Sequence, residues 1–103
     1  MFEDYINIGT DHDILFEDVK IAKTDAPLND GECTYELKTQ AGLVLDSGTV
    51  EYEVASVGNY YGVIDAAVTE TLVKNKIYLL TAVFVKDAYK VTKQLRLKAR
   101  YLP

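Results

Sequence analysis

The chain has 103 residues, of which 49% are hydrophobic and 26% charged, and its formal net charge at pH 7 is −5. These values fit one globular domain over residues 1–103 with a single core, and they exclude a wholly disordered chain. The single cysteine excludes an intrachain disulfide, and no apolar run reaches the roughly 18 residues of a membrane helix. We expect a soluble protein that is synthesised in the cytoplasm.

The N-terminal segment is acidic where a signal peptide would be basic. We expect residues 1–13 to form an N-terminal arm, followed by an irregular first strand in which the β-branched Val19 and Ile21 alternate with polar residues. A helix is the alternative for this segment, because helical spacing also relates Ile14, Leu15, Val19 and Ala22.

Short strands follow in the middle of the chain. Apolar and polar residues alternate in residues 33–38 and 49–54, and this period of two predicts strands with one buried face. Turn-forming residues occur at positions 40–42, 46–48, 57–59 and 74–76. Short strands with such frequent turns favour an antiparallel sandwich or barrel over a parallel α/β sheet.

Residues 76–86, with the sequence KIYLLTAVFVK, are apolar at both parities. The outer face of a simple two-layer sandwich is normally polar, so we expect something to cover this strand. The favoured cover is the chain's own N-terminal segment, through the apolar residues Phe2, Tyr5, Ile6 and Ile8. The alternative cover is a partner subunit.

The segment LVKNKIYLLTAVFV places Leu72 six residues before Tyr78, with a turn between them. This resembles the corner between the fifth and sixth strands of immunoglobulin-like and fibronectin-type sandwiches, which implies that the Tyr78 hydroxyl hydrogen-bonds back to the preceding turn. The order of segments over residues 31–101 is similar to that of small immunoglobulin-like proteins of tailed bacteriophages and prophages, found among head-tail joining and tail components.

The resemblance implies an all-β, immunoglobulin-like or fibronectin-like antiparallel β-sandwich of about seven strands. It also implies a non-enzymatic structural protein of the virion. Its partner would be either itself, as a homo-oligomer such as a ring, or another virion protein.

No residue pattern points to catalysis, to a metal or to a cofactor. His12 is the only histidine and lies between Asp11 and Asp13, a pattern typical of a solvated acidic loop. Cys33 occupies an apolar position of an alternating strand, where an inert buried thiol is expected. The glycines are scattered, so no phosphate-binding loop is predicted.

The eight tyrosines suggest a first alternative function. Tyr60 and Tyr61 are adjacent, so one faces the core and the other is a candidate for stacking on a sugar ring. The protein would then be a monomeric immunoglobulin-like module that binds a carbohydrate or a host surface. We expect core positions for Tyr35, Tyr52, Tyr78 and Tyr101.

Charge is distributed unevenly along the chain. Residues 1–53 carry a net charge of −10 and residues 54–103 a net charge of +5. In the last strand, apolar residues alternate with bases, which predicts a basic outer stripe; Lys93 falls at the inner parity, which predicts a bulge or a strand end there.

We expect the basic stripe to meet an acidic surface of another copy, head to tail, in a ring if the rotation closes. The candidate interface residues are Lys90, Arg96, Lys98 and Arg100 on one side and Asp11, Asp13, Glu17 and Asp18 on the other. A nucleic-acid-binding accessory protein is the second alternative, disfavoured by the acidic balance and by the lack of outward aromatic residues between the bases.

Overall fold

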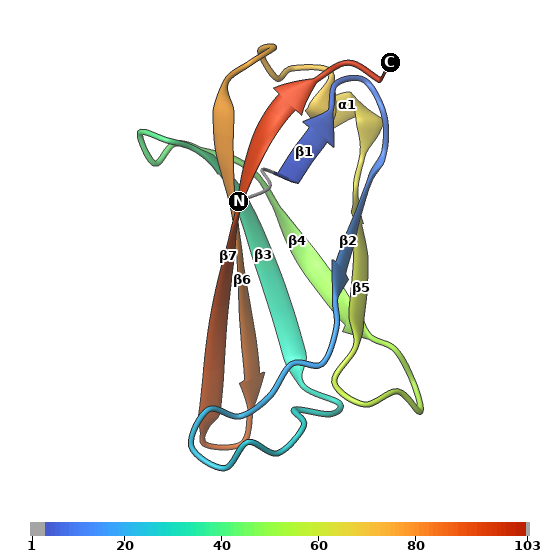
Figure 1. Cartoon of the computed structure of the whole chain (residues 1–103), viewed down its shortest axis with the longest axis vertical. Helices are drawn as coiled ribbons and strands as arrows, with labels where there is room; N and C mark the ends of the chain where they lie inside the picture. Colours follow the sequence, from blue (N-terminus) through green and yellow to red (C-terminus); the bar gives the residue numbers. More distant parts are fainter. Residues whose placement is uncertain (1–3, 103) are drawn as a thin grey trace.

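The computed structural model describes residues 4–102 and is all-β apart from one helical turn. The elements in chain order are β1 (Asp4–Asn7), β2 (His12–Phe16), β3 (Glu32–Thr39), β4 (Val44–Tyr52), β5 (Tyr60–Ile64), α1 (Ala66–Thr69), β6 (Ile77–Lys86) and β7 (Tyr89–Arg100). The strands form one 7-stranded sheet in the order β1-β7-β6-β3-β4-β5-β2. The sheet curls into a nearly closed, barrel-like shape, with β2 and β5 facing β3, β6 and β7 (Figure 1).

Strand β4 joins the two layers of this curled sheet. Residues 44–50 pair with β3, whereas Glu51 and Tyr52 pair with β5. All neighbouring strands are antiparallel except β1 and β7, which are parallel. The parallel pair departs from the expectation of a wholly antiparallel sheet. It arises because β1 runs along the last strand of the chain instead of forming a hairpin with β2.

Three aromatic side chains join the inner faces of the two layers. The rings of Tyr60 on β5 and Phe84 on β6 lie 4.8 Å apart, and Phe16 on β2 meets Phe84 edge-on at 5.3 Å. All three side chains are buried. Such edge-to-face pairs contribute about 0.5–1.5 kcal/mol each beyond the free energy of burying their area. The alternation of inward and outward residues in each strand is therefore fixed by what packs between the layers.

The predicted alternation is confirmed in β3, but the predicted turn at residues 46–48 is wrong, because these residues lie within β4. Gly48 lies opposite Tyr35, and a Cβ added there would approach the Tyr35 ring to 2.8 Å. The Tyr35 hydroxyl donates to the Asp46 carboxylate at 2.7 Å. The small and acidic residues at these positions thus accommodate a buried tyrosine within a strand.

The first strand after the N-terminal segment is β2, so the strand expectation is confirmed over residues 12–16. It is wrong at Val19 and Ile21, which lie in the loop of residues 17–31. Residues 4–13, in the range expected to be an arm, form β1 and the start of β2.

Within residues 4–102, the structure has no helix long and apolar enough to span a membrane.

Residues 4–8 do not cover the outer face of β6, which corrects the favoured expectation for Tyr5, Ile6 and Ile8. Strand β1 lies beside β7 in the same layer, in register from Asp4 opposite Leu97 to Asn7 opposite Arg100. Its apolar residues Ile6 and the following Ile8 are buried in the core. Phe2 lies outside the described residues. Within residues 4–102, the strands that pair with β6 are β3 and β7, at its two edges. On the outer face of β6, Ile77, Leu79 and Val83 are partly exposed and Val85 is exposed.

Two expectations about β7 are also wrong. Pairing with β6 continues without a register shift from Tyr89 to Lys98, so there is no bulge at Lys93. Lys93 is half-buried at the inward parity, on the part of β7 that β1 does not pair with. An inward-pointing charge on an open edge discourages pairing with a foreign strand. Tyr101 is 60% exposed instead of buried, because β7 ends at Arg100.

The expected hydrogen bond at Tyr78 is present. Its buried hydroxyl accepts from the Val73 backbone N–H at 2.9 Å and ties the turn before β6 to the strand. We predict that Tyr78→Phe lowers the free energy of unfolding by about 1 kcal/mol, the net value of one hydrogen bond. Urea unfolding followed by circular dichroism measures this change.

The matched control is Tyr61→Phe, because the exposed Tyr61 hydroxyl makes no hydrogen bond within residues 4–102. We expect this variant to unfold like the wild type. Equal unfolding midpoints for the two variants would show that the Tyr78 hydroxyl contributes nothing.

Candidate functional site

The residues most suited to chemistry do not form a reactive site. His12 and Cys33 lie in different layers of the sheet, and burial lowers the pKa of His12 despite the opposing charges of Asp13 and Asp4. Burial alone raises the pKa of the Cys33 thiol to about 12. Within residues 4–102, no three His, Cys, Asp or Glu side chains are grouped closely enough to hold a metal ion.

We predict that Cys33 does not react with a thiol reagent in the folded protein. With a pKa of about 12, about one thiol in ten thousand is ionised at pH 8, and the side chain is buried. Absorbance after addition of dithionitrobenzoate at pH 8 should stay flat until urea unfolds the chain.

The control is Thr34→Cys in a Cys33→Ser background, since Thr34 is the exposed neighbour on the outer face of the same strand. This variant should react within minutes without urea. Native Cys33 reacting as fast as the control would overturn the assignment of an inert thiol.

The four basic residues of β7 other than Lys93 point outward, away from the core, but they are not equivalent. The Arg100 guanidinium carbon lies 3.9 Å from the ring centroid of Tyr5, and Arg100 Nε donates to Asn7 Oδ1 at 3.4 Å. Both partners belong to β1. A cation–π contact of this type contributes about 0.5–1 kcal/mol at an exposed site. Arg100 therefore holds β1 against β7.

The other three bases are free to meet a partner. Within residues 4–102, Lys90, Arg96 and Lys98 make no ion pair, since the two ion pairs present join other residues. Each lies directly opposite an apolar residue on the outer face of β6. We call this combined surface the basic face, and it consists of Lys90, Arg96, Lys98, Ile77, Leu79, Val83 and Val85.

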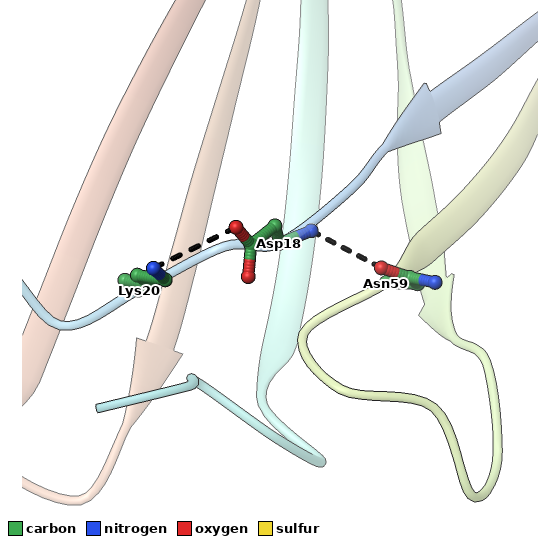
Figure 2. Close-up of polar contacts among 3 residues, drawn as sticks. All are labelled: Asp18, Lys20 and Asn59. Atoms are coloured by element: carbon green, nitrogen blue, oxygen red, sulfur yellow. Dashed lines mark hydrogen bonds and ion pairs between the residues drawn. The ribbon is translucent and has the colours of Figure 1, made fainter. Parts of the chain in front are cut away.

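Two of the four expected acidic counterparts are engaged within the fold. An Asp11 carboxylate oxygen accepts from the Ala66 backbone N–H at 2.7 Å, at the start of α1. Asp18 forms an ion pair with Lys20 at 3.7 Å, and its backbone N–H donates to Asn59 Oδ1 at 3.1 Å (Figure 2). These two aspartates fix loops.

Asp13 and Glu17 remain exposed on the outer side of β2 and of the loop that follows it. Neither forms an ion pair within residues 4–102. They are therefore the members of the expected acidic set that remain available to a partner.

The side chains of the adjacent Tyr60 and Tyr61 point to opposite sides of β5, one into the core and one to the surface, as expected. Tyr60 is fully buried, and its hydroxyl donates to the Leu28 carbonyl at 2.7 Å and accepts from the Gly31 N–H at 2.9 Å, so Tyr60 cannot stack on a ligand. Tyr61 is 51% exposed and lies opposite Leu15 across the β2–β5 pair. Only Tyr61 of this pair remains as a candidate binding residue.

Tyr61 lies in an open hollow of about 460 Å³, which is lined by Leu15, Glu51, Tyr52, Glu53 and Tyr61. Val63 is exposed further along β5, opposite Asp13. We call this second surface the acidic face, and it consists of Asp13, Leu15, Glu17, Glu51, Glu53, Tyr61 and Val63.

The sequence analysis missed Leu15 and Val63 as surface residues, although a signal for Leu15 exists. Leu15 lies between Ile14 and Phe16. Because successive side chains of a strand point to opposite sides, Leu15 must point to the surface if Ile14 and Phe16 point into the core. In the sequence, Glu51 and Glu53 belong only to the polar half of an alternating strand. Their grouping with Tyr61 depends on the pairing of β4 with β5.

Comparison of the chain with protein-family models, with curated proteins and with solved structures finds no match.

Proposed function

We propose that this is a non-enzymatic structural protein that works by protein–protein association through its basic face. The observation that carries the proposal is that an unpaired basic stripe on β7 lies beside a row of partly exposed apolar residues on the outer face of β6, of which Val85 is exposed. Apolar residues grouped at the surface next to unpaired charge are typical of an interaction site. The chain's own N-terminal strand leaves this surface uncovered.

The two stripes contribute in different ways. Burial of apolar surface supplies most of the favourable free energy, at roughly 25 cal/mol per Å² removed from water. Each exposed ion pair adds only about 0–1 kcal/mol. The bases instead orient the partner and exclude surfaces of the wrong charge. The partner of this face is therefore an acidic surface with apolar residues at its centre.

The finer fold assignment that we propose is an immunoglobulin-like sandwich. Pairing of β2 with β5, and of β6 with both β3 and β7, supports it, since these match the B–E and C–F–G pairings of that fold. The hydrogen bond between Tyr78 and Val73 supports it as well. The further assignment to a phage or prophage virion, among head-tail joining or tail components, has its support in the order of segments along the sequence alone.

The two alternative functions have less support. A nucleic acid on the basic face would meet Glu32 and Glu36, which lie on the neighbouring β3 at the levels of Val85 and Thr81. A carbohydrate would have Tyr61 as its one exposed aromatic platform in the hollow, within a rim of glutamates. Neither surface has the repeated aromatic residues that base stacking uses.

We predict that Arg96→Glu with Lys98→Glu abolishes self-association. The paired change replaces two unpaired bases of the basic face with glutamates, which an acidic partner surface would repel. The measurement is sedimentation velocity across a concentration series at low salt.

The matched control is Lys23→Glu with Lys74→Glu, which changes the charge equally at two exposed positions that belong to neither face and to neither of the two ion pairs. The control should associate like the wild type. Association that survives the β7 reversal, or that the control loses equally, would rule out the basic face as the contact.

A further inference from the structure

We infer that the acidic face of one copy is the docking site for the basic face of the next, so that the chain associates head to tail through two different surfaces. This inference rests on the proposed function and names its partner as a second copy of this chain. The argument follows from the chemistry of the two faces and from their positions on the sheet.

The acidic face has the composition that the basic face requires. Its centre is apolar, with Leu15 53% exposed, Tyr61 51% exposed and Val63 41% exposed. Around this centre lie four exposed acids, Asp13, Glu17, Glu51 and Glu53. The residues of β2 and β5 that point outward include no basic side chain. A surface of this kind attracts a basic, partly apolar partner and repels acidic ones.

The hollow beside Tyr61 suits a guanidinium group. An arginine can stack on the exposed ring while its N–H groups reach the carboxylates of Glu51 and Glu53, which line the same hollow. The chain already makes the stacking half of this contact internally, where Arg100 lies over Tyr5 at 3.9 Å. On the basic face, Arg96 is the exposed arginine, and Leu79 lies beside it to meet the apolar centre.

The two faces lie on opposite sides of the molecule. Tyr60 points from β5 toward Phe84 on β6, with their rings 4.8 Å apart, so the neighbouring Tyr61 points away from the layer of β6 and β7. Leu15 likewise points away, because Phe16 packs on Phe84. One copy cannot bring its own two faces together, and the contact must form between copies.

A contact between two different surfaces leaves one free face at each end of a dimer. Such an association continues into a ring when the rotation closes and into a filament when it does not. A two-fold contact of the basic face with itself would instead stop at the dimer. It would also bring the bases of one copy close to the bases of the other, and like charges repel. Charge complementarity therefore favours the head-to-tail arrangement.

The test uses two variants, each with one disabled face. Arg96→Glu with Lys98→Glu disables the basic face, and Leu15→Thr with Tyr61→Thr removes the apolar centre of the acidic face without adding a base that could pair with the new glutamates. A control with the same chemical changes elsewhere is Tyr89→Thr with Leu102→Thr, since both residues are exposed and neither belongs to either face. Circular dichroism and thermal unfolding establish that every variant is folded.

We expect each disabled variant alone to sediment as a monomer of 11.5 kDa, while the wild type and the control associate. An equimolar mixture of the two disabled variants retains one intact basic face and one intact acidic face. It should form a 1:1 heterodimer of twice the monomer mass and nothing larger. This complementation is the result that only a contact between different surfaces produces.

Other outcomes overturn the inference, and they separate it from the proposed function. If the acidic-face variant still associates while the basic-face variant does not, the basic face binds a different surface and only the head-to-tail inference fails. If the equimolar mixture of the two variants stays monomeric, the head-to-tail inference likewise fails. If the basic-face variant associates normally, the proposed function fails together with the inference. A wild-type chain that is monomeric throughout also refutes self-docking, although a foreign acidic partner for the basic face then stays open to test.

Discussion

The contact of Phe84 with Tyr60 and Phe16 is the constraint on which the rest of the molecule depends. It joins β5 and β2 to β6 at ring distances of 4.8 and 5.3 Å, and the Tyr60 hydroxyl also holds the loop before β3 through Leu28 and Gly31. Because successive residues of a strand point to opposite sides, this packing determines which side chains reach the surface. Tyr61 and Leu15 are exposed because their neighbours are buried.

The same constraint separates the charges of the chain. The acidic first half supplies β2 and the end of β4, whose outward residues surround Tyr61. The basic second half supplies β7, whose outward bases lie beside the apolar stripe of β6. The two layers pack against each other through their inner faces, so the acidic and basic outer faces lie on opposite sides of one small domain. A chain with this polarity is suited to contacts between copies.

Much of the fold follows from local patterns in the sequence. The period of two in β3 identified Cys33, Tyr35 and Leu37 as inward residues, and the spacing of Leu72 and Tyr78 indicated the hydrogen bond at the corner before β6. Local patterns could not reveal that residues 46–48 continue a strand, because Gly48 there accommodates a tyrosine from a neighbouring strand. Nor could they reveal that β1 would run parallel to β7, since that pairing joins segments about 93 residues apart.

The candidate surfaces were predictable only in part. The alternation in the last strand was sufficient to identify Arg96 and Lys98 as outward bases. Sequence reasoning did not distinguish Arg100, which contacts Tyr5, from its free neighbours, or Asp11 and Asp18, which fix loops, from Asp13 and Glu17. The grouping of Glu51 with Tyr61 and Leu15 requires three strands to be placed side by side. Surfaces built from several strands depend on the tertiary fold.

The central claim is that complementary charge and apolar surface on two sides of this domain drive its association. The most direct measurement is the absolute molar mass of the wild-type chain by light scattering during size exclusion, over a range of concentrations and from low to high salt. Our account predicts a mass that rises above 11.5 kDa with concentration and falls as salt increases, because the screening length shortens from about 10 Å at 0.1 M to about 3 Å at 1 M. A mass of 11.5 kDa under every condition would contradict it.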